Sequence, residues 1–220
     1  MKRPDETKRR YDDACGTAHA LELLGERWTL LVLRELMLGP RRFSEMRADL
    51  PGISARVLTQ RLGELEERGL VTRRMLAPPA SAQVYEATEW GREAEPILQE
   101  MGRWAARSHG HDPMLPISAV SVLLSFRTMI DDQRAGERDL TIQFDLGGRP
   151  YAARLAGGAL AIEAGELDAP DLLLEGAPEA MVAVAYGGAP LSMIHVRGDE
   201  RDARHFFSLF GLPDKVGVPA

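Results

Sequence analysis

The chain has 220 residues, 45% of them hydrophobic, which is enough to bury one large core or two modest ones. Its net charge of −6 argues against a nucleic-acid partner if taken as an average, because backbone phosphates are bound by Lys and Arg. Its single cysteine excludes an intrachain disulfide and a cysteine-rich zinc site. The charged N-terminal residues do not resemble a signal peptide, and no apolar run approaches the roughly 18 residues of a membrane span. We therefore expect a cytoplasmic protein with no membrane partner.

The negative charge is unevenly distributed. Residues 1–108 carry 18 Lys and Arg against 17 Asp and Glu, whereas residues 109–220 carry 9 against 16. The acidity thus belongs to the second half, and a local basic surface remains compatible with the first.

The segment SHGHDPMLP, residues 108–116, has two prolines, a glycine and no apolar periodicity, which indicates a linker. Before it the pattern is mostly helical, and after it a helix is followed by glycine-rich strands with tight turns expected at Gly147-Gly148 and Gly157-Gly158. The sequence therefore predicts an α+β protein of two domains, residues 1–110 and 111–220.

The first half shows the order of elements of a winged helix. Apolar residues recur at helical spacing in four segments, and two short extended segments precede a closing helix. The expected helices are residues 18–24, 27–38, 44–50 and 54–68, the expected hairpin strands are 70–77 and 83–88, and the closing helix is 90–108.

The helix that begins at Ser54, a candidate N-cap, has two different faces. Leu58, Leu62 and Leu65 lie within a narrow arc at 100° per residue, so polar residues face the other way. Arg can contact guanine bidentately, Gln can contact adenine, and Ser or Thr can take phosphates or bases. This pattern also fits an ordinary amphipathic surface helix. The helix end just before it and the basic hairpin just after it favour DNA binding, and the expected base-reading residues are Ser54, Arg56, Thr59, Gln60 and Arg61.

Other arginines of the first half are candidates for phosphate contacts. Arg73 and Arg74 lie in the expected hairpin, and Arg41 and Arg42 precede the third helix. Arg47, on that helix, fits a phosphate contact or a solvated surface charge almost equally.

Residues 15–105 resemble the HxlR family of bacterial regulators throughout. The resemblance is carried by Cys15, Gly25 and Trp28, by the strings RRFSEM, LPGIS and LTQRLGELEERGLVTR, and by Tyr85, Thr88 and Gly91 after the hairpin. It implies a winged helix-turn-helix transcriptional regulator that dimerises through its terminal helices and reads DNA with residues 54–68. The expected partners are therefore a second copy of the chain and a pseudo-palindromic operator with half-sites one helical turn apart.

The sequence departs from the family pattern at two places. Gly16 stands where the family often has Pro after the early cysteine, and Ala80 stands where an Arg often accompanies the paired prolines of the wing. A wing tip without that Arg is expected to grip the minor groove less tightly, leaving more of the phosphate contact to Arg73 and Arg74.

Cys15 is a redox candidate, because some relatives sense electrophiles or oxidants with a cysteine at this place. A reactive thiol needs exposure and a lowered pKa. The alternative, which the balanced charges around it favour, is a small residue that packs a helix.

The second half resembles the sterol-carrier-protein type 2 fold. The resemblance is carried by the segment DAPDLLLEG, by the closing GGAPLSMIHVRGDERDARHFFSLFGLP and by the length of about a hundred residues. It implies a hydrophobic small-molecule effector that modulates the regulator. Large apolar residues fill interiors by default, so each candidate ligand contact is equally a core residue; the candidates are Phe126, Met129, Phe144, Leu174, Met181, Phe206 and Phe207.

We expect no enzyme activity, cofactor or metal. The five histidines are scattered, and no glycine-rich phosphate loop, nucleophile elbow or metal-spaced cluster accompanies them. The alternative to a regulator is a small-molecule or lipid carrier whose winged helix makes only protein contacts.

Overall fold

The computed structural model describes residues 11–78 and 81–217, and the chain divides into two compact units, Met1–Ala94 and Glu95–Ala220. Each unit is described by itself. Helix α6 (Glu95–Ala106) belongs by its contacts to the second unit, whereas the sequence predicts that it belongs to the first domain. The functional boundary near residue 110 stays a prediction.

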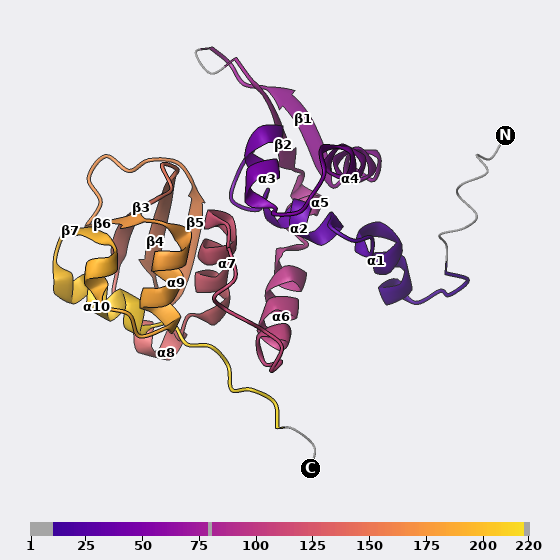
Figure 1. The fold of residues 1–220 in the computed structure, drawn as a ribbon. Helices are drawn as coiled ribbons and strands as arrows, with labels where there is room; N and C mark the ends of the chain where they lie inside the picture. Colours follow the sequence, from indigo (N-terminus) through magenta and orange to yellow (C-terminus); the bar gives the residue numbers. More distant parts are fainter. Residues whose placement is uncertain (1–10, 79–80, 218–220) are drawn as a thin grey trace. The chain divides into compact units, whose positions relative to one another are not determined.

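The first unit is a winged helix of short helices and one hairpin (Figure 1). The hairpin strands are antiparallel, with Val71 opposite Ala87 and Met75 opposite Gln83. The elements of this unit are α1 (Gly16–Leu24), α2 (Thr29–Arg34), α3 (Phe43–Asp49), α4 (Ala55–Glu67), β1 (Val71–Met75), β2 (Gln83–Ala87) and α5 (Glu89–Arg92).

Helix α4 begins and ends where local chemistry dictates. The Ser54 hydroxyl accepts a hydrogen bond from the Val57 backbone N–H at 3.2 Å, which satisfies one of the unpaired donors at the helix start. At the other end Gly69 has φ +74°, a left-handed conformation that glycine adopts without steric cost. The predicted cap at Ser54 is therefore confirmed.

A close approach between α5 and the start of β1 requires glycine at position 91. A Cβ atom on Gly91 would lie 2.0 Å from the carbonyl oxygen of Leu70. This contact is the physical reason for a glycine three residues after Thr88, just beyond the hairpin. Thr88 caps the same short helix by accepting from the Gly91 N–H at 3.0 Å.

The second unit combines one mixed sheet with helices, in the strand order β5-β4-β3-β6-β7. Strand β3 pairs antiparallel with β4 and parallel with β6, and both outer strands pair antiparallel. Its elements are α6 (Glu95–Ala106), α7 (Ala119–Met129), α8 (Asp132–Ala135), β3 (Leu140–Leu146), β4 (Pro150–Ala156), β5 (Ala159–Ala164), β6 (Leu172–Gly176), α9 (Pro178–Tyr186), the 3₁₀ turn η2 (Leu191–Met193), β7 (His195–Arg197) and α10 (Glu200–Ser208).

The two predicted glycine turns join consecutive strands as expected. Gly147 and Gly148 have φ +67° and +78°, and Gly157 and Gly158 have φ +56° and +77°. Positive φ at both central residues gives a hairpin turn the twist that antiparallel strands need. Glycine pairs at these positions therefore place β3, β4 and β5 side by side.

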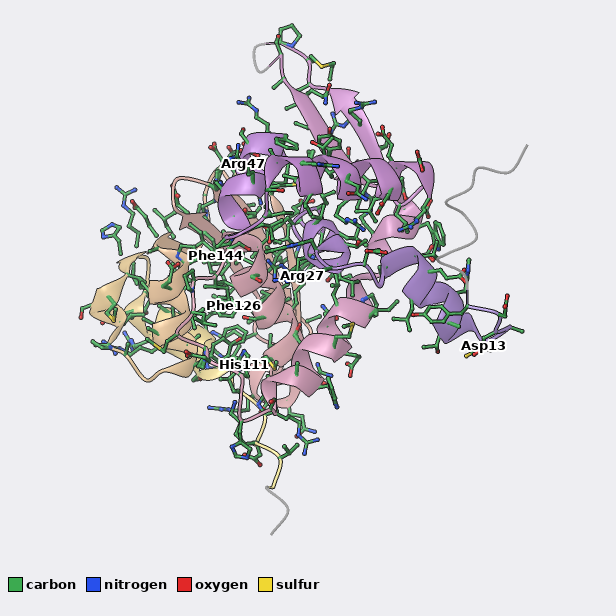
Figure 2. All side chains as sticks on the ribbon, turned by 45° about the vertical axis from the view of Figure 1, so that its right-hand side comes forward. Asp13, Arg27, Arg47, His111, Phe126 and Phe144 are labelled. Atoms are coloured by element: carbon green, nitrogen blue, oxygen red, sulfur yellow. The ribbon has the colours of Figure 1, made fainter. Side chains whose placement is uncertain are left out.

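An aromatic cluster fills the core of the second unit. Phe126 of α7 stacks on Phe210 with ring centroids 4.5 Å apart, and it contacts Phe144 of β3 and Phe206 of α10 at about 6 Å (Figure 2). The unit is α+β, as expected. Its likeness to the sterol-carrier fold stays a prediction.

Helix α6 is attached to the second unit along its whole length. At its start Arg127 donates to Glu95 at 2.6 Å, and near its end Arg103 donates to the carbonyl of Thr128 at 2.5 Å. Beyond its last turn, the Lys215 ammonium donates to the carbonyls of Ala106 at 3.0 Å and of residue 108 at 2.9 Å. A cation at this end also complements the helix dipole.

Over residues 11–78 and 81–217, no helix is both long and apolar enough to cross a membrane.

Candidate nucleic-acid interface

Helix α4 turns one face into the first unit and the opposite face to solvent. Leu58, Leu62 and Leu65 are each at most 1% exposed. Arg56 and Gln60 are exposed, as is Thr59 between them. Among the predicted base-reading residues, these three therefore have side chains available to a partner.

Two residues of this helix already use part of their hydrogen-bonding capacity. Ser54 accepts the capping bond from Val57, so its hydroxyl retains a donor for a phosphate or base. Gln60 donates from Nε2 to Glu64 Oε1 at 3.0 Å, one helical turn on. The second N–H and the Oε1 of Gln60 remain for a bidentate contact with adenine.

Arg61 does not face solvent, contrary to the expectation that it reads bases. It is 7% exposed, and its Nη1 lies 2.8 Å from Glu64 Oε2 and 3.3 Å from Glu26 Oε2. A buried guanidinium needs such partners, because an unpaired buried charge is costly. The spacing contained this signal: residue 61 lies three after Leu58 and four before Leu65, on the inner face. We therefore remove Arg61 from the candidate DNA contacts.

Arg41 is likewise internal, contrary to the expectation of a phosphate contact. It is 5% exposed, and its guanidinium lies between three carboxylates: Glu35 and Glu45 at 3.4 Å each and Asp49 at 2.5 Å. Its backbone also pairs with Tyr85 of β2, in both directions, at 2.9 and 2.8 Å. Arg41 thus joins α3 to the hairpin, and we remove it as well.

Three other arginines of the first unit remain exposed with uncompensated charge. Arg42 precedes α3, Arg47 lies on α3 (Figure 2), and Arg56 lies in the first turn of α4. Within the described part of the unit, none has a carboxylate within 4.0 Å. A guanidinium that the protein does not neutralise is available to a phosphate.

The two wing arginines are partly compensated by carboxylates. Arg73 Nε lies 3.4 Å from Glu66, and Arg74 Nε lies 2.7 Å from Glu86 on the opposite strand. Both side chains are about half exposed, so the pairs are accessible to competing phosphates. The expected effect of Ala80 at the wing tip lies outside the described residues.

Cys15 is an exposed residue at the start of α1. The backbone N–H and hydroxyl of Thr17, together with the backbone N–H of Ala18, lower the pKa of its thiol by stabilising the thiolate. Exposure argues against the interpretation of Cys15 as a residue that packs a helix. Both requirements for a reactive thiol are met.

The candidate ligand contacts of the second unit lie in its packed interior. Phe126, Phe144, Leu174, Met181 and Phe206 are fully buried. Phe207 contacts Phe206 edge-on at 5.5 Å, and Met129, at the end of α7, is half-buried. Because the rings contact one another, this arrangement favours a filled core over a ligand site.

Comparison with known proteins places the helix-turn-helix in a family. A model described as HxlR-like helix-turn-helix matches residues 23–112. The HTH-type transcriptional regulator YkvN of Bacillus subtilis is 42% identical over 91 residues, which cover 41% of this chain and 77% of that protein. The chain belongs to the HxlR-like helix-turn-helix family.

A second relative matches a region of similar length. YodB, another HTH-type transcriptional regulator of B. subtilis, is 41% identical over 86 residues, 39% of this chain and 77% of the relative. The solved reduced form of YodB covers 46% of this chain and all of its own, at 36% identity and a TM-score of 0.40. These HxlR-family relatives are transcriptional regulators, and α4 lies within the matched region.

Substituting the neighbouring residues Arg41 and Arg42 in turn tests whether Arg41 is internal and Arg42 is exposed. Arg41→Ala should lower the free energy of unfolding by about 3 kcal/mol, because it removes the buried cation that lies among the carboxylates of Glu35, Glu45 and Asp49. Arg42→Ala should change it by less than about 0.5 kcal/mol, as surface substitutions do. Chemical denaturation of the two variants measures both effects, and equal midpoints would show that the placement of Arg41 is wrong.

Proposed function

We propose that this protein is a transcriptional regulator that binds operator DNA as a homodimer, with α4 of each copy in the major groove. The observation that carries the proposal is the division of α4, inside the family-matched region, into a buried leucine face and an exposed polar face. The exposed face offers Arg56, Thr59 and Gln60 to base edges.

The distribution of charge along α4 supports a model in which the N-terminal end of the helix enters the major groove. Arg56 lies in the first turn, whereas Glu64, Glu66 and Glu67 lie in the last two turns. Base contacts at the start of the helix keep these carboxylates away from the phosphates. Arg42 and Arg47 then supply contacts to the backbone beside the groove, and the wing arginines add to them.

Selection of bound DNA from a random pool tests this reading face. Arg56→Ala and Gln60→Ala should each relax the base preference at a separate position, with discrimination falling by about 1–3 kcal/mol, because each removes a bidentate contact. Arg154→Ala, a charge-matched control in the second unit, should leave the selected sequence unchanged. An unaltered preference in both α4 variants would contradict the proposal.

Helix α6 supplies a surface for the second copy. Ile97, Met101 and Trp104 follow one another at helical spacing and are 48–77% exposed, while Arg103 and Glu95 bond to α7. A contiguous apolar stripe on a helix is typical of an interface rather than of a monomer surface. We assign it to self-association, since a two-fold dimer buries the same patch on both copies.

A charge within this stripe should separate the copies. Trp104→Asp should shift the protein from dimer to monomer in analytical ultracentrifugation, because the new carboxylate would be buried without a partner. Its affinity for a palindromic operator should fall more than its affinity for a half-site. Met114→Asp, at an equally exposed methionine outside the helix, is the control, and a Trp104→Asp protein that remains dimeric would refute the assignment.

The exposed thiol of Cys15 supports a second element of the proposal, regulation by oxidants. The hydrogen bonds that lower its pKa raise the thiolate fraction at neutral pH, and the thiolate is the reactive species. With one cysteine in each chain, oxidation by diamide joins two thiols in an intermolecular disulfide and transfers two electrons and two protons to diamide.

The rate of Cys15 alkylation by iodoacetamide should follow this lowered pKa. The pH at which this rate is half-maximal should lie below the corresponding pH for a free cysteine peptide measured alongside, since the thiolate forms at lower pH. Diamide should reduce operator affinity in the wild type and leave Cys15→Ser unaffected. The same diamide response in both proteins would remove Cys15 from the regulatory mechanism.

A hydrophobic effector in the second unit is a further proposal that rests on the sequence resemblance. A ligand among the candidate residues would have to displace rings of the aromatic cluster. If such a ligand regulates the protein, the affinity for operator DNA should change when lipid is added. The alternative function is a lipid carrier whose winged helix makes only protein contacts. That function predicts lipid binding without any affinity for DNA.

A further inference from the structure

Arg27 is an exposed cation that the sequence analysis does not single out. It lies in the loop between α1 and α2 (Figure 2), and its guanidinium carbon is 5.5 Å from the centroid of the Trp28 ring. This distance is within the range of cation–π attraction. The ring attracts the guanidinium, and the N–H groups of the guanidinium can still act as donors.

The loop that carries Arg27 is fastened to the reading helix at two points. Before α4, the Trp28 ring lies 3.8 Å from the position of a Cβ atom on Gly52, in the turn that leads from α3 into α4. On α4 itself, Arg61 forms its ion pair with Glu26. Arg27 lies between these two attachments, so its position is coupled to that of α4.

The backbone conformation of Trp28 indicates that surrounding contacts hold the loop between α1 and α2 in place. Trp28 has φ +80°, a left-handed conformation that is a true outlier for a bulky side chain. Such a conformation persists only where the surroundings determine it, and it is concentrated at functional sites. Here it places the indole beside the turn before α4 and beneath the guanidinium of Arg27.

Within the described residues, no carboxylate pairs with the charge of Arg27. Its sequence neighbour Glu26 is paired with Arg61, and among the residues with described placement no carboxylate lies within 4.0 Å of Arg27. The wing arginines, by contrast, each have a carboxylate partner. Arg27 therefore resembles Arg42, Arg47 and Arg56 in having a guanidinium with no competing anion.

We propose that Arg27 binds a backbone phosphate of the operator, beside the groove that α4 enters. This inference rests on the proposed DNA-binding function and adds a contact to it. A planar guanidinium suits phosphate geometry, because it can donate two parallel N–H bonds to the phosphate oxygens. The contact positions α4 on the duplex and does not depend on base sequence.

Equilibrium binding of a selected operator and of an unrelated duplex, over a series of salt concentrations, tests the contact. Arg27→Ala should weaken both complexes by a similar factor of about ten, as expected for a lost charge-assisted hydrogen bond. The slope of log K against log salt should become shallower by about 0.9, one phosphate's share of released counterions. Base preference in selection should not change.

Three further variants separate the contact from effects on folding. Arg27→Lys should keep the salt slope and lose part of the affinity, because the charge is retained and the planar set of N–H donors is lost. Arg27→Gln should reproduce Arg27→Ala, and a thermal melt of each establishes that it is folded. Arg201→Ala, which removes an exposed charge of the second unit, should match the wild type.

The outcomes distinguish this contact from the proposed function itself. A wild type that binds DNA, together with Arg27→Ala and Arg27→Gln proteins of unchanged affinity and slope, would overturn the phosphate contact alone. A changed base preference in Arg27→Ala would also overturn it, by showing that Arg27 reads bases. A wild type that binds neither duplex would overturn the DNA-binding function and this contact together.

Discussion

The buried leucine face of α4 is the constraint on which the first unit and its proposed function depend. Each of Leu58, Leu62 and Leu65 contributes about 1.5–3 kcal/mol by leaving water, which fixes the rotation of the helix about its own axis. A rotation that exposed the leucines would also bury Arg56 without a partner. The same burial that stabilises the fold therefore decides which side chains a nucleic acid can reach.

Two groups of arginines in the first unit have different physical roles: a buried pair, and an exposed group of Arg27, Arg42, Arg47 and Arg56. Arg41 and Arg61 are buried among carboxylates and connect segments distant in sequence: Arg41 joins α3 to β2 through its backbone, and Arg61 joins α4 to the loop before α2. The exposed group has no carboxylate within ion-pair distance in the described structure. A count of basic residues cannot separate these groups, because each contributes one charge to the total whatever it contacts.

Helix α6 gives the second unit a direct part in the proposed dimer. The unit holds this helix by Arg127 at its start, by Thr128 along its side and by Lys215 beyond its end. Its apolar stripe stays exposed. Any change inside the second unit that displaces α7 must therefore also act on the helix that carries the stripe, which provides a physical route for regulation without a special signalling element.

Features set by local sequence could be predicted from the residues alone. Helical periodicity, the Ser54 cap, the glycine-pair turns and the family motifs depend on neighbours within a few positions, so they located the elements and the outward face of α4. Only the tertiary structure decided the destination of Arg41, the carboxylates that pair with Arg61, the attachment of α6 and the position of Arg27 beside the turn before α4. Each depends on groups that sequence spacing does not bring together, such as Tyr85 opposite Arg41 and Lys215 at the end of α6, and the energy of a charge is set by those distant partners.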